Sequence, residues 1–326
     1  MGRWHAPMSE HNRPLAVALN GYGLLRPDGL GREVLPMDDV VHALHAAERG
    51  GYESVFMPEI AAREAFSTLT LLATKTERIR LATGVIRIDR RDLRTTALAA
   101  ATVQEAAEGR FLLGMGSRFA IDRTRSFLAD LRLLLAGETV HGPGGPERLD
   151  TASGDTPLYL AALGPRMCEL AGELADGVIL NWCTPERVAR AREEIAAGAA
   201  RAGRDPGAVR MVVYVRTSLE PDEVATTSLR EAASQYAAMP TYARQFEAMG
   251  LGEEAAAAAG SPGAVPERLL REVCAWGDRD GALERLQAYH EAGADVVAVY
   301  PVPVLDAASS ILATVLGVAP RPAAAA

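Results

Sequence analysis

Short runs rich in Val, Ile and Leu alternate with longer Ala-, Leu- and Arg-rich segments along the whole chain, and this alternation constrains the fold most. The short runs indicate buried parallel strands, and the longer segments have the period of helices. Eight strands are expected, at residues 15–19, 54–57, 79–85, 110–114, 157–161, 177–180, 209–216 and 295–300. A doubly wound open sheet uses the same alternation with fewer strands. Eight βα units in 326 residues favour an α/β fold closed into a (β/α)8 TIM barrel.

Helices are expected between these strands, at residues 37–48, 64–74, 92–107, 124–136, 166–174, 185–202, 265–274 and 280–292. Two stretches depart from the rhythm. The helical stretch 223–259 predicts a helical insertion between strands 7 and 8, and the Gly- and Pro-rich stretch 140–154 predicts a surface loop. We expect residues 1–13 to form a flexible extension, residues 14–319 one barrel domain, and residues 320–326 a disordered tail.

The charge balance excludes some partners. Acidic residues outnumber basic ones by 42 to 34, a net charge of -8, which gives no electrostatic support for nucleic acid or an anionic membrane. Cys168, Cys183 and Cys274 form no Cys-x-x-Cys pair, so no metal is predicted. Residues 1–13 lack the apolar core of a signal peptide, and no apolar stretch approaches membrane-span length. A cytoplasmic protein is expected.

The loops that follow the strands form the active face of such a barrel, and two of them present free backbone N–H groups at a helix start. The first contains Ala162, Leu163, Gly164 and Arg166, where a phosphate can bind; the alternative is a purely structural tight turn. The second runs through Asn181, Cys183 and Thr184. There the alternative is that Thr184 simply caps the helix that starts at Pro185.

Several phrases occur in an order that resembles one known superfamily. They are residues 57–67 (MPEIAAREAFS), 76–85 (TERIRLATGV), 109–116 (GRFLLGMG), 162–165 (ALGP), 175–182 (ADGVILNW), 241–250 (TYARQFEAMG) and 277–280 (GDRD). Together they resemble the luciferase-like monooxygenase superfamily, and in particular its F420-dependent branch, which includes enzymes like methylenetetrahydromethanopterin reductase. The resemblance extends over residues 14–316.

The resemblance implies a homodimeric TIM barrel that holds its cofactor at the carboxyl ends of the strands. It implies a non-prolyl cis peptide between Gly84 and Val85 behind the cofactor ring; the alternative is an ordinary glycine at a strand end. Glu59 falls at the pocket-facing position after strand 2, where it is the expected proton donor unless it only pairs with Arg63 or another arginine. Tyr22 is a second candidate donor, or simply part of the wall.

This chain departs from the family pattern after strand 4. Relatives carry a longer loop with a His or Glu there, whereas residues 117–123 lead directly into a helix, so the loop is shortened. We interpret this as an open mouth that admits a bulky or peptide-borne substrate; the alternative is a neutral deletion. Arginines in residues 89–92 (DRRD) meet an acidic tail or a substrate carboxylate, or else form a solvated charged run.

The leading functional prediction is hydride transfer from reduced coenzyme F420 to a C=C, C=N or C=O group of a small-molecule or peptide-borne substrate. Specialised metabolism, such as reduction of a dehydroamino acid in a modified peptide, is the expected setting. The first alternative is an FMN-dependent monooxygenase served by a partner flavin reductase. The second is a non-catalytic barrel that binds flavin.

Overall fold

Eight parallel strands close into a ring in the computed structural model, which describes residues 13–25, 32–60, 62–142, 144–220, 222–304 and 306–320. Pairing runs from β10 through β11, β12, β14, β1, β4 and β5 to β7, and β7 pairs with β10 to complete the circle. The prediction of a (β/α)8 barrel is therefore confirmed. The strands are β1 (Leu15–Ala18), β4 (Ser54–Met57), β5 (Arg80–Thr83), β7 (Phe111–Gly116), β10 (Leu158–Ala161), β11 (Gly177–Asn181), β12 (Arg210–Ser218) and β14 (Val296–Pro301).

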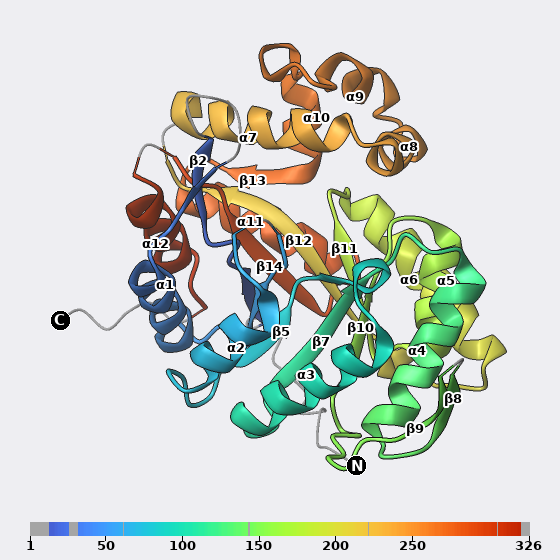
Figure 1. Ribbon diagram of the computed structural model, residues 1–326. Helices are drawn as coiled ribbons and strands as arrows, with labels where there is room; N and C mark the ends of the chain where they lie inside the picture. The colour runs from blue at the N-terminus through green and yellow to red at the C-terminus, as the bar shows by residue number, and fades with distance from the viewer. Residues whose placement is uncertain are drawn as a thin grey trace.

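Helices surround this ring (Figure 1), and polar side chains fix where several of them begin. Asp92 caps α3 by accepting from the N–H of Thr95, and Asp278 caps α11 in the same way through Gly281. The last helix, α12, was not predicted. The outer helices are α1 (Met37–Arg49), α2 (Ala65–Ala73), α3 (Leu93–Ala106), α4 (Ile121–Leu135), α5 (Pro165–Leu174), α6 (Pro185–Arg201), α11 (Arg279–Glu291) and α12 (Ala307–Gly317).

Alternation along each strand separates two cores. Val213 and Val215 pack outward under the helices, whereas Val212 and Tyr214 face the barrel interior together with small residues such as Ala16 and Ala82. Alanines on β1 and β5 leave room in the interior for Phe56 and Tyr214, whose rings meet edge to face at 5.6 Å. The barrel is thus filled by side chains and its free space lies at the ends of the strands.

The predicted insertion between strands 7 and 8 is present and has its own core. It contains α7 (Asp222–Ala237), α8 (Pro240–Ala248), α9 (Gly252–Ala258), α10 (Glu267–Val273) and β13 (Cys274–Trp276), and Figure 1 shows these helices gathered at one end of the barrel. Phe246 and Leu269 are fully buried there, together with Trp182 from the barrel. The insertion is therefore anchored to the loop after β11.

Three details of the secondary structure correct the sequence analysis. Cys274 does not end a helix but begins β13, because the long strand β12 offers an edge on which Cys274 pairs with Arg216. The stretch 140–154 is not all loop: β8 (Val140–Gly142) and β9 (Gly145–Glu147) form a hairpin whose turn includes Gly145 at φ +110°. A second unpredicted hairpin joins β2 (Tyr22–Leu25) to β3 (Arg32–Val34).

The predicted extension and tail fall, apart from Arg13 and Pro320, outside the described residues. Within the described part of the chain, no helix combines the length and apolar character that a membrane span requires. Only residues 117–120 separate β7 from α4, so the loop after strand 4 is short, as predicted.

Buried His290 on α11 makes the stability of the fold depend on pH. Burial lowers the pKa of His290, and its Nε2 has no hydrogen-bond partner among the described residues, while Nδ1 lies 3.1 Å from the carbonyl oxygen of Ala294. The folded state therefore binds fewer protons than the unfolded state once the pH falls below about 6.5.

We predict that the free energy of unfolding decreases as the pH falls from about 7 to 5, and that His290→Asn flattens this dependence. Urea unfolding at several pH values measures it. Exposed His141 provides the matched control, because His141→Asn should keep the wild-type slope. An equal slope in wild type and His290→Asn would show that another group governs acid sensitivity.

Candidate functional site

A cavity of about 950 Å³ opens where the strands end. Its walls come from the ends of β4, β5, β7, β10 and β11, and the insertion closes one side with Tyr236, Met239 and Tyr242. The volume lies at the upper end of the roughly 300–1,000 Å³ that small-molecule sites occupy. Among the residues predicted from the sequence, the lining includes Glu59, Gly84, Val85, Leu163 and Asn181.

The other predicted site residues lie behind or beside this cavity. Tyr22 is on the β2–β3 hairpin, and Ala162 and Cys183 are buried, with the carbonyl of Cys183 accepting from Tyr289 at 2.9 Å. Thr184 caps α6 through the N–H of Arg187 at 3.3 Å, which is the structural alternative considered for it.

The phosphate-binding role of the loop at the start of α5 stays a prediction. Gly164 is the N-cap of α5, uses no side-chain cap, and has no atom within 4 Å of the position where a Cβ would sit. Arg166 is exposed beside it. Pro165 has no N–H and the N–H groups of Met167 and Cys168 donate to the carbonyl of Gly164, so few N–H groups remain here for an anion.

Gly84, Val85 and Gly116 form the floor of the cavity. The peptide bond between Gly84 and Val85 is cis, as predicted. A Cβ on Gly84 would lie 2.3 Å from the hydroxyl of Tyr214 and 2.7 Å from Cβ of Phe56, and one on Gly116 would lie 2.8 Å from Cγ2 of Val85. Only glycine permits these approaches. The two glycines therefore allow close packing where β5 and β7 end, with the side chain of Val85 against Gly116.

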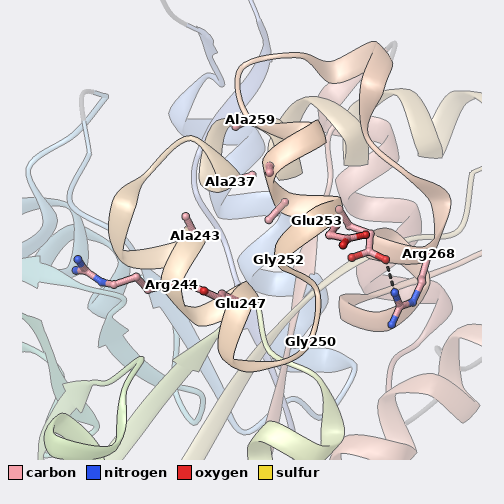
Figure 2. Close-up of a pocket in the computed structure, with 12 residues that line it drawn as sticks. Ala237, Ala243, Arg244, Glu247, Gly250, Gly252, Glu253, Ala259 and Arg268 are labelled. Atoms are coloured by element: carbon pink, nitrogen blue, oxygen red, sulfur yellow. Dashed lines mark hydrogen bonds and ion pairs between the residues drawn. The ribbon is translucent and has the colours of Figure 1, made fainter.

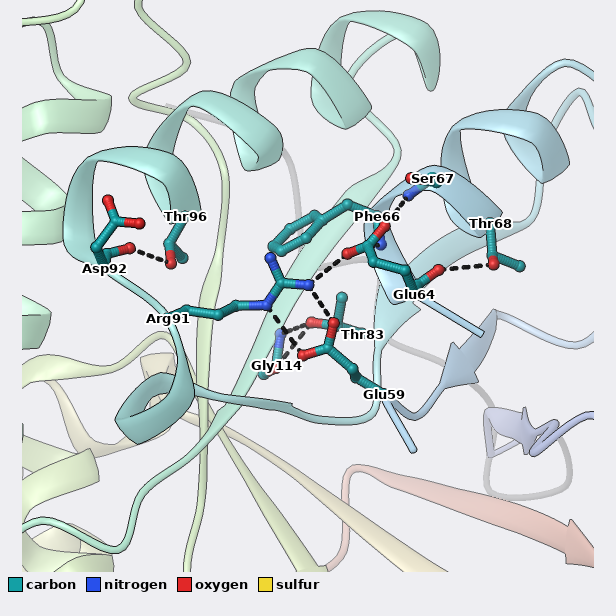
Figure 3. A network of polar contacts seen from close by, with 10 residues as sticks. All are labelled: Glu59, Glu64, Phe66, Ser67, Thr68, Thr83, Arg91, Asp92, Thr96 and Gly114. Atoms are coloured by element: carbon teal, nitrogen blue, oxygen red, sulfur yellow. Dashed lines mark hydrogen bonds and ion pairs between the residues drawn. The ribbon is translucent and has the colours of Figure 1, made fainter. Parts of the chain in front are cut away.

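Glu59 pairs with an arginine. Both carboxylate oxygens of Glu59 accept hydrogen bonds from Arg91, one of them from Nε at 2.9 Å, and Arg91 also contacts Glu64 (Figure 3). The hydrogen bond that Arg91 donates to Glu59 raises the pKa of Arg91. This is the ion-pair alternative raised for Glu59, with Arg91 in place of Arg63, which instead donates to the carbonyl of Leu35.

Glu64 holds Arg91 in place from the other side. It caps α2 by accepting from the N–H groups of Phe66 at 3.1 Å and Ser67 at 2.6 Å, as Figure 3 shows. The guanidinium of Arg91 lies 4.9 Å from the centre of the Phe66 ring. Arg91 is therefore fixed by a helix cap, an aromatic face and Glu59, and it links α2 to the loop after β5.

The rim next to this network is rich in arginine. Four arginines line the cavity, Arg87, Arg90, Arg91 and Arg118. The hydrogen bond from Arg87 lowers the pKa of Asp89 and fixes that side chain, and Arg91 is paired with Glu59 and Glu64. Arg90 and Arg118 have no ion-pair partner among the described residues, so these two are the arginines that can meet an anionic group of a ligand.

Two polar residues next to Asn181, Arg216 and Tyr242, were not predicted from the sequence as site residues. Arg216 is 2% exposed and lies against the rings of Tyr300 and Trp182, at 4.1 and 4.4 Å. It donates to Oδ1 of Asn181, and Nδ2 of Asn181 donates to the hydroxyl of Tyr242 at 2.8 Å. A signal was present: Val212, Tyr214 and Arg216 alternate along β12, so all three face the barrel interior.

Tyr214 brings an unsatisfied hydroxyl to the floor. Its oxygen is buried, has no hydrogen-bond partner among the described residues, and lies beside Gly84. Burial raises the pKa of Tyr214 well above its ordinary value, so the hydroxyl keeps its proton. A buried donor without a partner beside the cavity floor is a feature expected of a ligand site.

A second hollow, of about 640 Å³, lies on the insertion away from the strand ends. Figure 2 shows its wall of α8 and α9, with small alanine and glycine positions and an ion pair from Arg268. Arg268 pairs with Glu254, whereas Arg244 points away from that pair in Figure 2, so the charged side chains do not converge on a common point. The cavity at the strand ends is therefore the better candidate for chemistry.

Comparison with known proteins shows to which family the chain is similar. The family model described as luciferase-like monooxygenase matches residues 24–296. The 5,10-methylenetetrahydromethanopterin reductase of Methanolobus tindarius is 35% identical over 59% of this chain and 66% of its own length. The enzyme of the same name from Archaeoglobus fulgidus is 33% identical over 54% of this chain and 59% of its own length. The matches thus span less than two thirds of either relative.

A solved structure has the same fold over nearly the whole chain. The coenzyme F420-dependent tetrahydromethanopterin reductase from Methanopyrus kandleri superposes with a TM-score of 0.74 at 19% identity, covering 94% of this chain and 98% of that one. At this level of identity the match bears on the fold.

The glycine floor generates a stability prediction. Gly84→Ala should lower the free energy of unfolding by about 1–3 kcal/mol, because the added methyl group must displace the Tyr214 hydroxyl or the Phe56 side chain. Gly263→Ala is the control, since no atom lies within 4 Å of its Cβ position. Urea unfolding of both variants measures the difference. Equal stability of the two variants would contradict the close approach at Gly84.

Proposed function

This chain belongs to the luciferase-like monooxygenase family, and on that premise we propose that it is an oxidoreductase that uses reduced coenzyme F420 to reduce an unsaturated substrate. The observation that carries the proposal is the combination of a floor that contains two glycines with an arginine-rich rim in one cavity. Similarity to a putative coenzyme F420-dependent oxidoreductase of Mycobacterium tuberculosis, 29% identical over 52% of this chain, supports the choice of F420 over a flavin.

The residues of the cavity fit such a cofactor. F420 is a planar tricyclic deazaflavin with a phosphate- and carboxylate-bearing tail. We place the flat ring against Gly84, Val85 and Gly116, because two of these three lining residues carry no side chain. Arg87, Arg90 and Arg118 would face an anionic tail, with the N–H groups near Gly164 and Thr184 as the predicted phosphate sites.

When bound, reduced F420 supplies a hydride. The protein must then orient the acceptor and provide a proton, and Glu59 was the predicted donor. Its bidentate pair with Arg91 supports instead a positioning role, because a carboxylate that already accepts two N–H groups is arranged as an acceptor. The predicted role of Tyr22 stays a prediction.

The finer proposals concern substrate and assembly. The loop of four residues between β7 and α4 supports an open mouth, and we propose a bulky or peptide-borne substrate, with a dehydroamino acid as one example. A homodimer in the cytoplasm, acting in specialised metabolism, remains part of the proposal on the ground of family resemblance. The second candidate is an FMN-dependent monooxygenase with a partner reductase, favoured by the name of the family model itself.

Anaerobic titration of the full chain separates these candidates. We expect reduced F420 to bind, and its absorbance to return to that of the oxidised form when an enone, an imine or a ketone from a test panel is added. Reduced FMN, titrated in parallel, should bind more weakly and pass no hydride to the panel. Tight binding of FMN without any response to F420 would overturn the proposal in favour of the monooxygenase.

A further inference from the structure

We infer that Tyr242 is the proton donor to the substrate, and that Arg216 and Asn181 set the direction in which its hydroxyl donates. This inference rests on the proposed reduction and names a catalytic residue for it. Tyr242 lies on α8 of the insertion, far in sequence from every residue predicted for the site. It lines the same cavity as the Gly84–Val85 floor.

Arg216 is the fixed point of this arrangement. Counting along β12 places it on the interior face above Tyr214, where the rings of Trp182, Tyr236 and Tyr300 surround it at 4.1–5.0 Å. No carboxylate pairs with it among the described residues. A guanidinium carries only donors, so whatever atom it contacts must be an acceptor. Its one hydrogen-bond partner in the described chain is the side chain of Asn181.

The orientation of Asn181 follows from that contact. Because Arg216 can only donate, the amide must turn its oxygen toward Arg216 and its nitrogen the other way. That nitrogen lies 2.8 Å from the hydroxyl of Tyr242 and carries only hydrogens to give. The Tyr242 oxygen is therefore the acceptor in this pair.

The hydroxyl proton of Tyr242 is left without a partner. Its oxygen accepts from Asn181, and no acceptor for its hydrogen is present among the described residues. The ring is held against Tyr236 in an edge-on contact at 4.7 Å, and half-buried Tyr242 forms part of the cavity wall. The hydroxyl of Tyr242 is held in position, has no acceptor for its hydrogen among the described residues, and belongs to a residue that lines the cavity. It can therefore donate its proton to a bound substrate.

The electrostatics agree with a donor that is neutral and protonated before the transfer, and whose phenolate is stabilised after it. Burial raises the pKa of Tyr242, so it carries its proton throughout the physiological range. Once the proton has left, the phenolate oxygen keeps the N–H of Asn181, and the positive charge of Arg216 stands behind it with no counter-ion to cancel its field.

The step balances as follows. The acceptor gains a hydride at one carbon of a polarised double bond, so it gains two electrons while the cofactor loses two. Electron density moves to the neighbouring carbon or heteroatom, which takes the proton of Tyr242 as the O–H bond breaks. Water entering through the open mouth returns a proton to the phenolate. Glu59, already bonded to Arg91, is not needed for the transfer.

Two variants test the direction of the hydrogen bond separately from the presence of the hydroxyl. Tyr242→Phe removes the donor. Asn181→Asp keeps the hydroxyl, but its carboxylate pairs with Arg216 and accepts from Tyr242, so the proton turns away from the cavity. Tyr52→Phe is the matched control: it removes a buried hydroxyl that donates to Val315 at 2.7 Å, near the start of β4 and far from the strand carboxyl ends.

Binding of oxidised F420, followed by fluorescence, and the saturated rate of 2-cyclohexen-1-one reduction by reduced F420 are measured for each protein. Because Asn181 and Tyr242 line the cavity, the F420 affinity of each variant is measured first and rates are compared at saturating F420, and Tyr52→Phe is expected to bind F420 like the wild type. Tyr242→Phe and Asn181→Asp should lower the rate by roughly 10²-fold or more, within the range that general acids contribute, and Tyr52→Phe should not. A solvent isotope effect that is present on the wild-type rate and absent from the residual rate of Tyr242→Phe would identify the proton transfer as the affected step.

A readout without turnover completes the test. In protein labelled with 3-fluorotyrosine and loaded with oxidised F420, the Tyr242 fluorine resonance should shift on addition of cyclohexenone in wild type and stay unchanged in Asn181→Asp. Full rates in both variants, or no shift in wild type, would overturn the role of Tyr242 while leaving the reductase intact. Failure of wild type to bind F420 would overturn the reductase, and with it this inference.

Discussion

Closure of the parallel strands is the constraint on which the rest of this structure depends. Once β7 pairs with β10, all eight strands end on one rim, and residues separated by more than a hundred positions become neighbours. Glu59 after β4, Gly84 after β5 and Asn181 at the end of β11 share one cavity for this reason alone. The insertion after β12 closes the side of that cavity that the barrel leaves open.

Two features of the rim then shape its chemistry. On one wall, glycines allow the backbones of β5 and β7 to come close; a Cβ on Gly114 would lie only 2.1 Å from the carbonyl oxygen of Thr83. On the other wall, Arg216 brings a buried positive charge among aromatic rings. The first provides the surface against which we place the ring, and the second controls which atoms of Asn181 and Tyr242 face the ligand.

The sequence predicted the barrel well because β-branched runs and helix caps are local signals, and eight of them leave few alternatives. The short loop after β7 and the pocket-facing position of Glu59 could also be predicted, because both depend only on where a strand ends in the sequence. The pairing of Glu59 with Arg91 could not be predicted, because the two residues are 32 positions apart in the sequence and meet only in the folded chain. Tyr242 was missed because helical periodicity in the insertion does not reveal which face meets the barrel. The hairpin at 140–147 was missed because its strands are too short to show alternation.

A crystal structure of the protein with F420 would show whether the cavity above Gly84–Val85 holds the redox cofactor, as we propose. We predict density for the tricyclic ring against Gly84, Val85 and Gly116, with the anionic tail toward Arg87, Arg90 or Arg118. Density for the cofactor in the hollow between α8 and α9, or at the strand amino ends, would contradict it.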